Sequence, residues 1–142
     1  MFVEIQHTWV GDVVVSLTHV SRSAILIDRP GVPERGAGCG ADDISTVLDD
    51  EALTPVENEC GENPAIDGDH TPNNPLSVFD GDNAAGIWRL NVSDRFPGDN
   101  GALSGWCLGV NTAPFGDGVR NVARGLVPRK AFVIRGARKG RD

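Results

Sequence analysis

Carboxylate side chains dominate the chemistry that this sequence could perform. Three loop-like segments carry closely spaced aspartates, with a glycine in or near each segment. These aspartates are Asp42 and Asp43, Asp80 and Asp82, and Asp94 and Asp99. Such loops can surround calcium with the six to eight oxygen ligands that it takes. The pattern therefore predicts calcium as the cofactor, although no loop has EF-hand spacing and aspartate also serves ordinary turns.

Serine-hydrolase chemistry and zinc chemistry find little support. His7 and Asp12 are close in sequence, but no Gly-x-Ser-x-Gly turn presents a serine nucleophile. The three histidines, His7, His19 and His70, are too far apart in sequence to form a zinc motif. We therefore predict no catalytic residue in this chain, and we expect His7 and Trp9 to pack at the end of a strand.

The three cysteines, Cys39, Cys60 and Cys107, predict one disulfide. Cys39 and Cys60 flank an acidic loop segment, and a bridge between them would add about 3 kcal/mol of stability in the chain-entropy model. Such a bridge implies an oxidising compartment, which predicts secretion. Three reduced thiols in a cytosolic protein are the alternative. Cys107 is then either free or bonded to a residue outside this chain.

Charge divides the chain near residue 112. Residues 1–112 contain 5 Arg and 18 Asp or Glu, a net of −13, whereas residues 113–142 contain 8 Lys or Arg and 2 Asp, a net of +6. The acidic part would repel phosphate, so we expect no nucleic-acid partner. No apolar run approaches the roughly 18 residues of a membrane span, and residues 1–4 show no signal-peptide pattern. We predict one domain over residues 1–112, followed by a basic, Gly-rich, disordered tail over residues 113–142 without an assigned role.

Short strands with two-residue alternation must position these side chains. Strand-like runs cover residues 2–6, 13–18, 24–28 and 44–48, with Gly, Pro, Asn and Asp between them. The clearest runs are residues 86–92 and 105–111, which we expect to pair antiparallel. We expect residues 49–69 to be irregular. The pattern predicts an all-β jelly-roll β-sandwich with mostly antiparallel strands.

The three tryptophans, Trp9, Trp88 and Trp106, form the expected aromatic signature of the core. Trp88 and Trp106 alternate in phase with the aliphatic residues of their strands, which indicates that both pack inward. Trp9 lies in a loop and is the best candidate for an exposed contact. A sugar-stacking platform made by Trp88 and Trp106 is the alternative, and it would indicate a carbohydrate-binding module.

The order of short motifs along residues 2–111 resembles the P domain, also called the P/Homo B domain, of proprotein convertases and bacterial subtilisin-like proteases. The motifs are HTWVGD at 7–12, RPG at 29–31, GC at 38–39, DDI at 42–44, LDD at 48–50, PNNPL at 72–76, FDG at 79–81, GIWRL at 86–90, VSD at 92–94, GD at 98–99 and LSGW at 103–106. Each motif is weak alone, and their number in one order carries the resemblance. It implies a jelly-roll β-sandwich without catalytic residues.

The resemblance also implies a role. It indicates a non-catalytic accessory module of a secreted subtilisin-like serine endopeptidase, which supports the folding, stability or regulation of an adjacent catalytic domain as its partner. The family has one or two strands before the segment that matches residues 2–6, so we expect this chain to lack them and to leave an unpaired sheet edge. An extracellular adhesion module, or one that binds glycans or proteins, is the alternative function.

Overall fold

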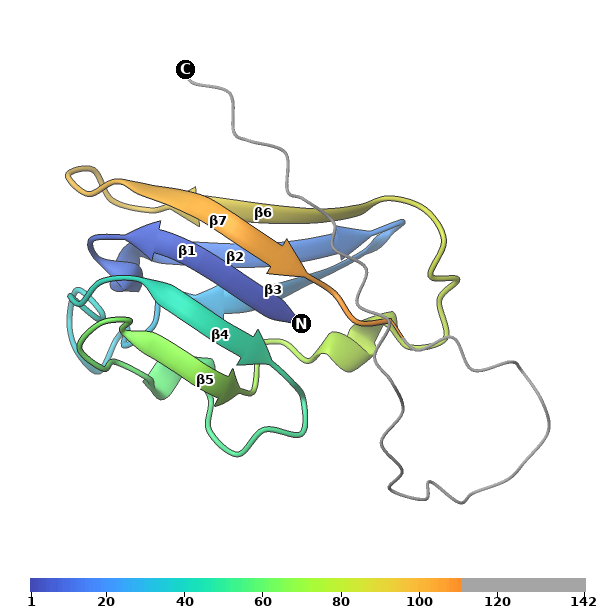
Figure 1. Cartoon of the computed structure of the whole chain (residues 1–142), viewed down its shortest axis with the longest axis horizontal. Helices are drawn as coiled ribbons and strands as arrows, with labels where there is room; N and C mark the ends of the chain where they lie inside the picture. Colours follow the sequence, from blue (N-terminus) through green and yellow to red (C-terminus); the bar gives the residue numbers. More distant parts are fainter. Residues whose placement is uncertain (111–142) are drawn as a thin grey trace.

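The computed structural model describes residues 1–110, which form a sandwich of two β-sheets (Figure 1). The strands are β1 (Phe2–His7), β2 (Val13–His19), β3 (Arg22–Asp28), β4 (Ile44–Leu48), β5 (Ile66–His70), β6 (Trp88–Asp94) and β7 (Gly101–Cys107). One sheet has the order β5–β4–β1–β7 and the other has the order β3–β2–β6. The predicted all-β sandwich is confirmed. The tail predicted over residues 113–142 lies outside the described residues.

Three short 3-10 helices connect the strands, and antiparallel pairing dominates the sheets. The helices are η1 (Val10–Asp12), η2 (Val56–Asn58) and η3 (Leu76–Phe79). Within the two sheets only β4 and β5 run parallel. No α-helix forms in residues 1–110, as the absence of an apolar helical period predicts.

Alternation along the strands builds the core between the two sheets. Val3 and Ile5 of β1 and Val15 and Leu17 of β2 are fully buried, while Glu4 is exposed between the two β1 residues. β-Branched residues fit this pleated, half-buried setting well. The packing follows the two-residue period that the sequence shows.

The expected pairing of residues 86–92 with residues 105–111 is wrong. β6 pairs with β2, and β7 pairs with β1, so the two strands belong to different sheets. The segment 95–100 carries the chain from one sheet to the other. Alternation shows which face of a strand is apolar, but it does not show which strand lies beside it.

The expectation that residues 49–69 are irregular is also wrong, because this region includes most of β5. β5 pairs parallel with β4, from Ile44 opposite Ile66 to Leu48 opposite His70. Only the end residues of β5 are buried, and the three residues between them, Asp67 to Asp69, are exposed. An edge strand with a polar middle gives no alternating signal, so it escapes sequence reasoning.

The loops gather at two ends of the sandwich (Figure 1). The disulfide end, at the left of Figure 1, contains the segments 8–12, 29–43, 59–65 and 95–100. The tryptophan end, at the right, contains the segments 20–21, 49–55 and 71–87 and the start of β6 at Trp88. The strand directions therefore bring together loops that lie far apart in the sequence.

Candidate functional site

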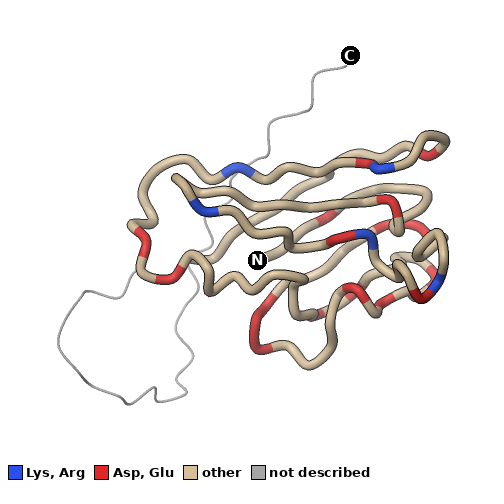
Figure 2. Tube along the Cα trace, turned by 180° about the vertical axis from the view of Figure 1, so that it is seen from behind, with Lys and Arg blue, Asp and Glu red and all other residues tan. Residues whose placement is uncertain are grey.

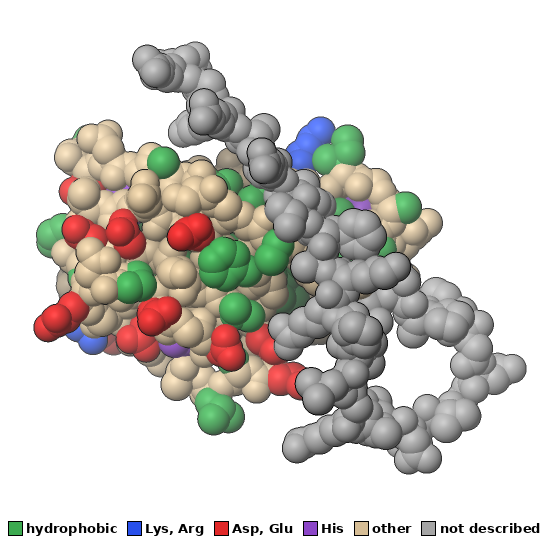
Figure 3. Space-filling model, in the orientation of Figure 1, with side chains coloured by type: hydrophobic (Ala, Val, Ile, Leu, Met, Phe, Trp, Pro, Cys, Tyr) green, Lys and Arg blue, Asp and Glu red, His purple; other side chains and the backbone are tan. Residues whose placement is uncertain are grey.

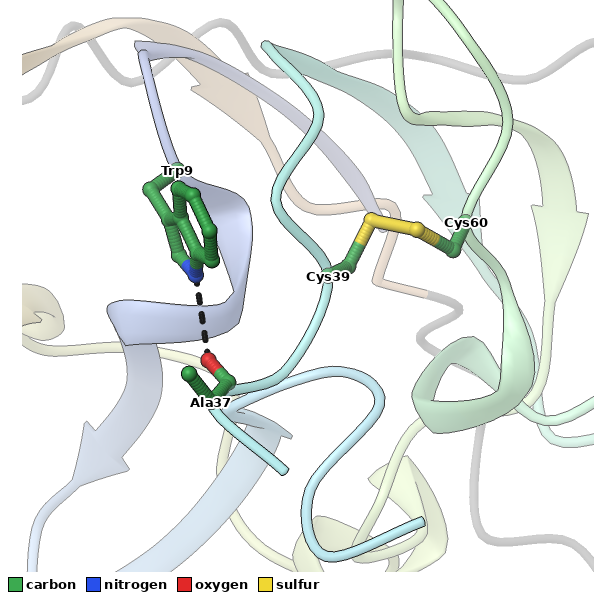
Figure 4. Close-up of a disulfide and its surroundings, with 4 residues drawn as sticks. All are labelled: Trp9, Ala37, Cys39 and Cys60. Carbon is green, nitrogen blue, oxygen red and sulfur yellow. Dashed lines mark hydrogen bonds between the residues drawn. A yellow bond between two sulfur atoms is a disulfide. The ribbon is translucent and has the colours of Figure 1, made fainter. Parts of the chain in front are cut away.

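The disulfide end is tied together by the predicted bond between Cys39 and Cys60, which is confirmed (Figure 4). The two Cα atoms lie 5.6 Å apart, and Cys39 is fully buried in the core. The bond joins segment 29–43 to segment 59–65. Cys107, half-buried on β7, is free.

Two glycines let the backbone cross closely beside this disulfide. The Gly11 amide donates to the carbonyl of Cys39 at 2.8 Å. A Cβ atom on Gly11 would lie 2.5 Å from the Cys39 nitrogen and 2.8 Å from the Gly38 Cα, and Gly38 itself has a φ of +85°. Only glycine fits such a crossing and such a backbone conformation without strain. The glycines at positions 11 and 38 are therefore required by the geometry of this end.

Trp9 forms a fixed wall on the surface of the disulfide end. Its indole N–H donates to the Ala37 carbonyl at 3.0 Å (Figure 4). Its six-membered ring lies over Gly40, because a Cβ there would come within 2.8 Å of the ring carbon Cη2. Trp9 is half-buried, so one side of the ring is held while part of it faces solvent.

The other two tryptophans lie elsewhere. Trp106 on β7 is only 4% exposed, and its indole N–H has no hydrogen-bond partner among the described residues. Trp88 on β6 is half-buried and stacks on His19, with ring centroids 3.9 Å apart. The two tryptophans occupy different sheets, and no shared exposed platform favours the sugar-stacking alternative.

His19 completes the packing of the tryptophan end. It is fully buried, and its Nε2 lies 2.8 Å from the Asn83 carbonyl oxygen while its Nδ1 lies 3.2 Å from that of Ile87. The histidine thus connects the end of β2 to the segment before β6. This arrangement is a structural one, because both ring nitrogens face backbone oxygens.

The six aspartates predicted to bind calcium divide between the two ends. Asp42, Asp43, Asp94 and Asp99 lie at the disulfide end, and Asp80 and Asp82 lie at the tryptophan end. Among residues 1–110, no group of three or more His, Cys, Asp or Glu side chains is arranged to hold a metal ion. The calcium site stays a prediction.

Protein groups already engage most of these carboxylates. Asp43 Oδ1 accepts from the backbone amide of His7 at 2.9 Å, and Asp99 Oδ1 accepts from the Thr8 hydroxyl at 2.8 Å. Asp94 Oδ1 accepts from the Phe96 amide at 3.0 Å. At the tryptophan end, Asp82 forms an ion pair with Arg22 at 3.3 Å. These contacts are typical of turns and loop anchors.

Asp12 lies among the aspartates of the disulfide end, although the sequence argument did not count it as a cation ligand. Asp12 ends η1 and is only 5% exposed. Its carboxylate receives no hydrogen bond from residues 1–110. Burial raises the pKa of this carboxyl, and the charge of Asp94 raises it further, while Arg29 opposes both effects.

His7 lies next to this carboxylate group without catalytic geometry. Its Nδ1 accepts from the backbone amide of Trp9 at 3.1 Å, so a neutral ring carries its proton on Nε2. That Nε2 lies 3.4 Å from Asp94 Oδ2 without the alignment of a hydrogen bond. Neither nitrogen meets a serine hydroxyl among the described residues. His7 therefore packs at the end of its strand beside Trp9.

A surface pocket of about 440 Å³ opens beside Asp12, and we call it the Asp12 pocket. Its lining comprises Trp9, Asp12, Arg29, Gly36, Ala37, Phe96 and Asp99. Backbone hydrogen bonds hold the segments that line the pocket in place. The Arg95 amide donates to the Asp12 carbonyl at 2.9 Å, and the Arg29 amide donates to the Val13 carbonyl at 2.9 Å. Three segments distant in sequence thus form one concave site.

Sequence reasoning missed Arg29 and Phe96 as parts of this site. The Arg29 Nε donates to the Gly11 carbonyl at 3.3 Å, and its guanidinium carbon lies 4.5 Å from the centroid of the Phe96 ring. The Phe96 side chain is 50% exposed. A lone phenylalanine in a polar turn was the signal that could have identified this surface.

The described surface is acidic. Figure 2 shows Asp and Glu positions along the loops of both ends, and Arg29, Arg35 and Arg95 lie among those of the disulfide end. Figure 3 shows acidic side chains spread around hydrophobic ones over the face of the β5–β4–β1–β7 sheet. Such a surface favours a partner that carries positive charge. Within residues 1–110, no helix is long and apolar enough to cross a membrane.

Comparison with known proteins adds two findings. Residues 57–110 match the family described as "Proprotein convertase P-domain". The chain is also 32% identical over 101 residues to a protein of Trichormus variabilis named "Calcium-dependent protease". The alignment covers 71% of this chain and 12% of that relative, so the chain spans a small part of the relative's length. No solved structure matches the chain significantly.

Proposed function

Because this chain carries a P domain of the proprotein convertase family, we propose that it acts as an accessory module of a secreted subtilisin-like serine endopeptidase. The module supports the folding, stability or regulation of an attached catalytic domain. It performs no peptide-bond cleavage itself. The observation that carries the proposal is the family match. The matched region is part of a β-sandwich in which most polar side chains anchor loops or pack in the interior.

The disulfide end is the side of the module that we assign to the protease domain. It combines the Asp12 pocket with the half-exposed aromatic rings of Trp9 and Phe96. Its loops are held by the disulfide and by the close crossing at Gly11. Ordered loops on a rigid scaffold lose little conformational entropy when they bind.

The disulfide also supports a secreted location, because such bonds persist in oxidising compartments. Calcium has weaker support. The name of the relative is compatible with it, but most of the predicted ligands already accept hydrogen bonds or pair with an arginine, and no group of three or more His, Cys, Asp or Glu side chains within residues 1–110 is arranged to hold a metal ion. Thermal melting of this chain in calcium chloride and in EDTA tests the ion. A higher Tm in calcium would keep the prediction, and equal Tm values would reject it.

The test of the proposed function uses the parent protease with and without this module. We expect deletion of the module to lower the yield of folded protease and the Tm of its catalytic domain. A full-length parent that carries Gly11→Ala serves as a matched control, since it keeps the chain length while it disrupts the disulfide end. Equal yield, stability and peptide hydrolysis in all three forms would reject an accessory role. Binding of the isolated chain to glycans on an array would favour an adhesion module instead.

A further inference from the structure

The Asp12 pocket holds a carboxylate that accepts no hydrogen bond from the described protein and belongs to a largely buried residue. Asp12 is 5% exposed, lines the pocket, and accepts no hydrogen bond from residues 1–110. Burial of a carboxylate without a partner costs free energy. Burial first, and the charge of Asp94 second, raise the pKa of Asp12. The raised pKa reflects the same free-energy cost of keeping this carboxylate charged. A cation from outside would remove this cost.

The second carboxylate and the aromatic walls define what kind of cation fits. Asp99 lines the pocket, and the Thr8 hydroxyl holds its carboxylate in place. Trp9 is fixed by its bond to the Ala37 carbonyl, and Phe96 offers a half-exposed ring. Aromatic faces attract organic cations, and paired carboxylate oxygens match the forked N–H groups of a guanidinium.

A metal ion does not suit the same surroundings. No group of three His, Cys, Asp or Glu side chains within residues 1–110 is arranged for a metal. The pocket, at about 440 Å³, is far larger than a single ion, and indole and phenyl rings supply no oxygen ligands. A flat organic cation fills the space and uses both the rings and the carboxylates.

Arg29 belongs to the pocket and its charge lowers the pKa of Asp12, but it does not pair directly with that carboxylate. Its Nε is bonded to the Gly11 carbonyl, and its guanidinium lies over the Phe96 ring. It forms no ion pair with Asp12 or Asp99 within 4 Å. The lining thus has two carboxylates for one guanidinium, and Asp94 adds a third negative charge nearby. The charge balance favours a cationic ligand over an anionic one.

We propose that the Asp12 pocket binds the guanidinium group of an arginine side chain presented by a partner protein. The arginine donates to the carboxylates of Asp12 and Asp99, while its plane lies against Trp9 and its stem contacts the part of the Phe96 ring that Arg29 leaves exposed. This inference stands on the geometry of the pocket. That the attached protease domain supplies the arginine rests on the proposed function.

The test is an NMR titration of the full 142-residue chain, labelled with ¹⁵N, with N-acetyl-arginine amide as the probe. We expect saturable shifts at the Trp9 indole N–H and at the amides of Gly36, Ala37 and Phe96. The neutral isostere N-acetyl-citrulline amide should bind at least about tenfold more weakly, because the charge is lost. Equal binding of the two compounds, or shifts confined to other residues, would overturn the proposal.

Three variants sharpen the test. Asp12→Asn and Asp99→Asn should each weaken arginine binding, by about tenfold and by a few-fold respectively. Asp69→Asn removes one exposed carboxylate on β5 and should leave binding unchanged. Asp99→Asn keeps the test valid even if Asp12→Asn alters the fold. Undiminished binding by both pocket variants would contradict the proposal, as would displacement of the arginine probe by stoichiometric calcium.

These outcomes separate the inference from the proposed function. Failure of the arginine probe, together with loss of protease yield upon deletion of the module, would reject the pocket and keep the accessory role. Binding of the probe, together with a protease that is indifferent to the module, would keep the pocket and reject the accessory role.

Discussion

The two ends of the sandwich use polar side chains in opposite ways. At the tryptophan end, His19 is fully buried, with both ring nitrogens near backbone oxygens and its ring stacked on Trp88. At the disulfide end, Asp12 is almost as deeply buried, yet its carboxylate faces an open pocket without a hydrogen-bond partner. At one end the ring nitrogens of the buried His19 face backbone oxygens, and at the other end the carboxylate of Asp12 faces a pocket without a hydrogen-bond partner.

This difference distinguishes buried polar groups that stabilise the packing from those that can bind a ligand. A buried polar group that the protein satisfies itself adds order and stability. A buried charge left without a partner lowers stability, and such costs gather at sites that bind something. Covalent and backbone constraints at the disulfide end offset that cost, since the Cys39–Cys60 bond and the Gly11 crossing hold its loops.

The largest expected loss of stability comes from adding a side chain where two backbone segments cross closely at the disulfide end. Gly11→Ala places a Cβ 2.5 Å from the Cys39 nitrogen, so it should lower the free energy of unfolding by more than about 3 kcal/mol. Gly105→Ala on β7 is the control, because a Cβ there meets no atom within 4 Å. Urea denaturation measures both. A Gly11→Ala variant as stable as Gly105→Ala would show that the crossing is not a constraint.

Removal of the disulfide should have the next largest effect. The Cys39→Ala/Cys60→Ala variant should lose about 3 kcal/mol, because the bond closes a loop with a sequence separation of 21. Cys107→Ala removes the free thiol and should cost much less. Thermal melts with and without a reducing agent give the comparison. If reduction leaves the Tm of the natural sequence unchanged, the bond does not stabilise this end.

A third substitution tests the internal packing of the tryptophan end. His19→Ala should destabilise by about 2 kcal/mol, because it removes the ring stacked on Trp88 and leaves the carbonyl of Asn83 without its partner. Binding of N-acetyl-arginine amide should not change, since the two ends lie apart. Lost arginine binding in a folded His19→Ala variant would contradict the independence of the two ends.

The smallest expected effect is a gain in stability from Asp12→Asn. The folded state raises the pKa of Asp12 above the ordinary value of 3.8, so folding favours the protonated form. The stabilising contribution of protonated Asp12 to the free energy of unfolding is therefore fully present below about pH 4. It is lost as the pH rises through the raised pKa. At pH 7 the variant should be more stable by less than about 1 kcal/mol, because the pocket is partly solvated. Unfolding curves at pH 3.5 and pH 7 check this, and an equal gain at both values would refute it.

Local sequence signals predicted much of the fold. Alternation identified β2 and β4 nearly to the residue, and the loop setting of Cys39 and Cys60 identified the disulfide. β5 was missed because only its end residues are buried. The partners of β6 and β7 were assigned wrongly because pairing depends on contacts far apart in sequence.

The site was harder to predict than the fold. Four of the six chosen aspartates do lie at one end, but the aspartate whose pKa burial raises is Asp12. The burial and raised pKa of Asp12 depend on segments 29–43 and 95–100, which lie next to it only once the two sheets have formed. Composition can indicate an acidic loop, but it cannot show which carboxylate lacks a partner.

Hydrogen exchange on the chain, alone and mixed with the catalytic domain of the proposed parent protease, tests the central claim most directly. We predict slower amide exchange at segments 8–12, 29–43 and 95–100 upon addition of the catalytic domain, with segments 71–87 unchanged. Slowed exchange confined to segments 71–87, or no change anywhere, would contradict the assignment of the disulfide end as the binding end of an accessory protease module.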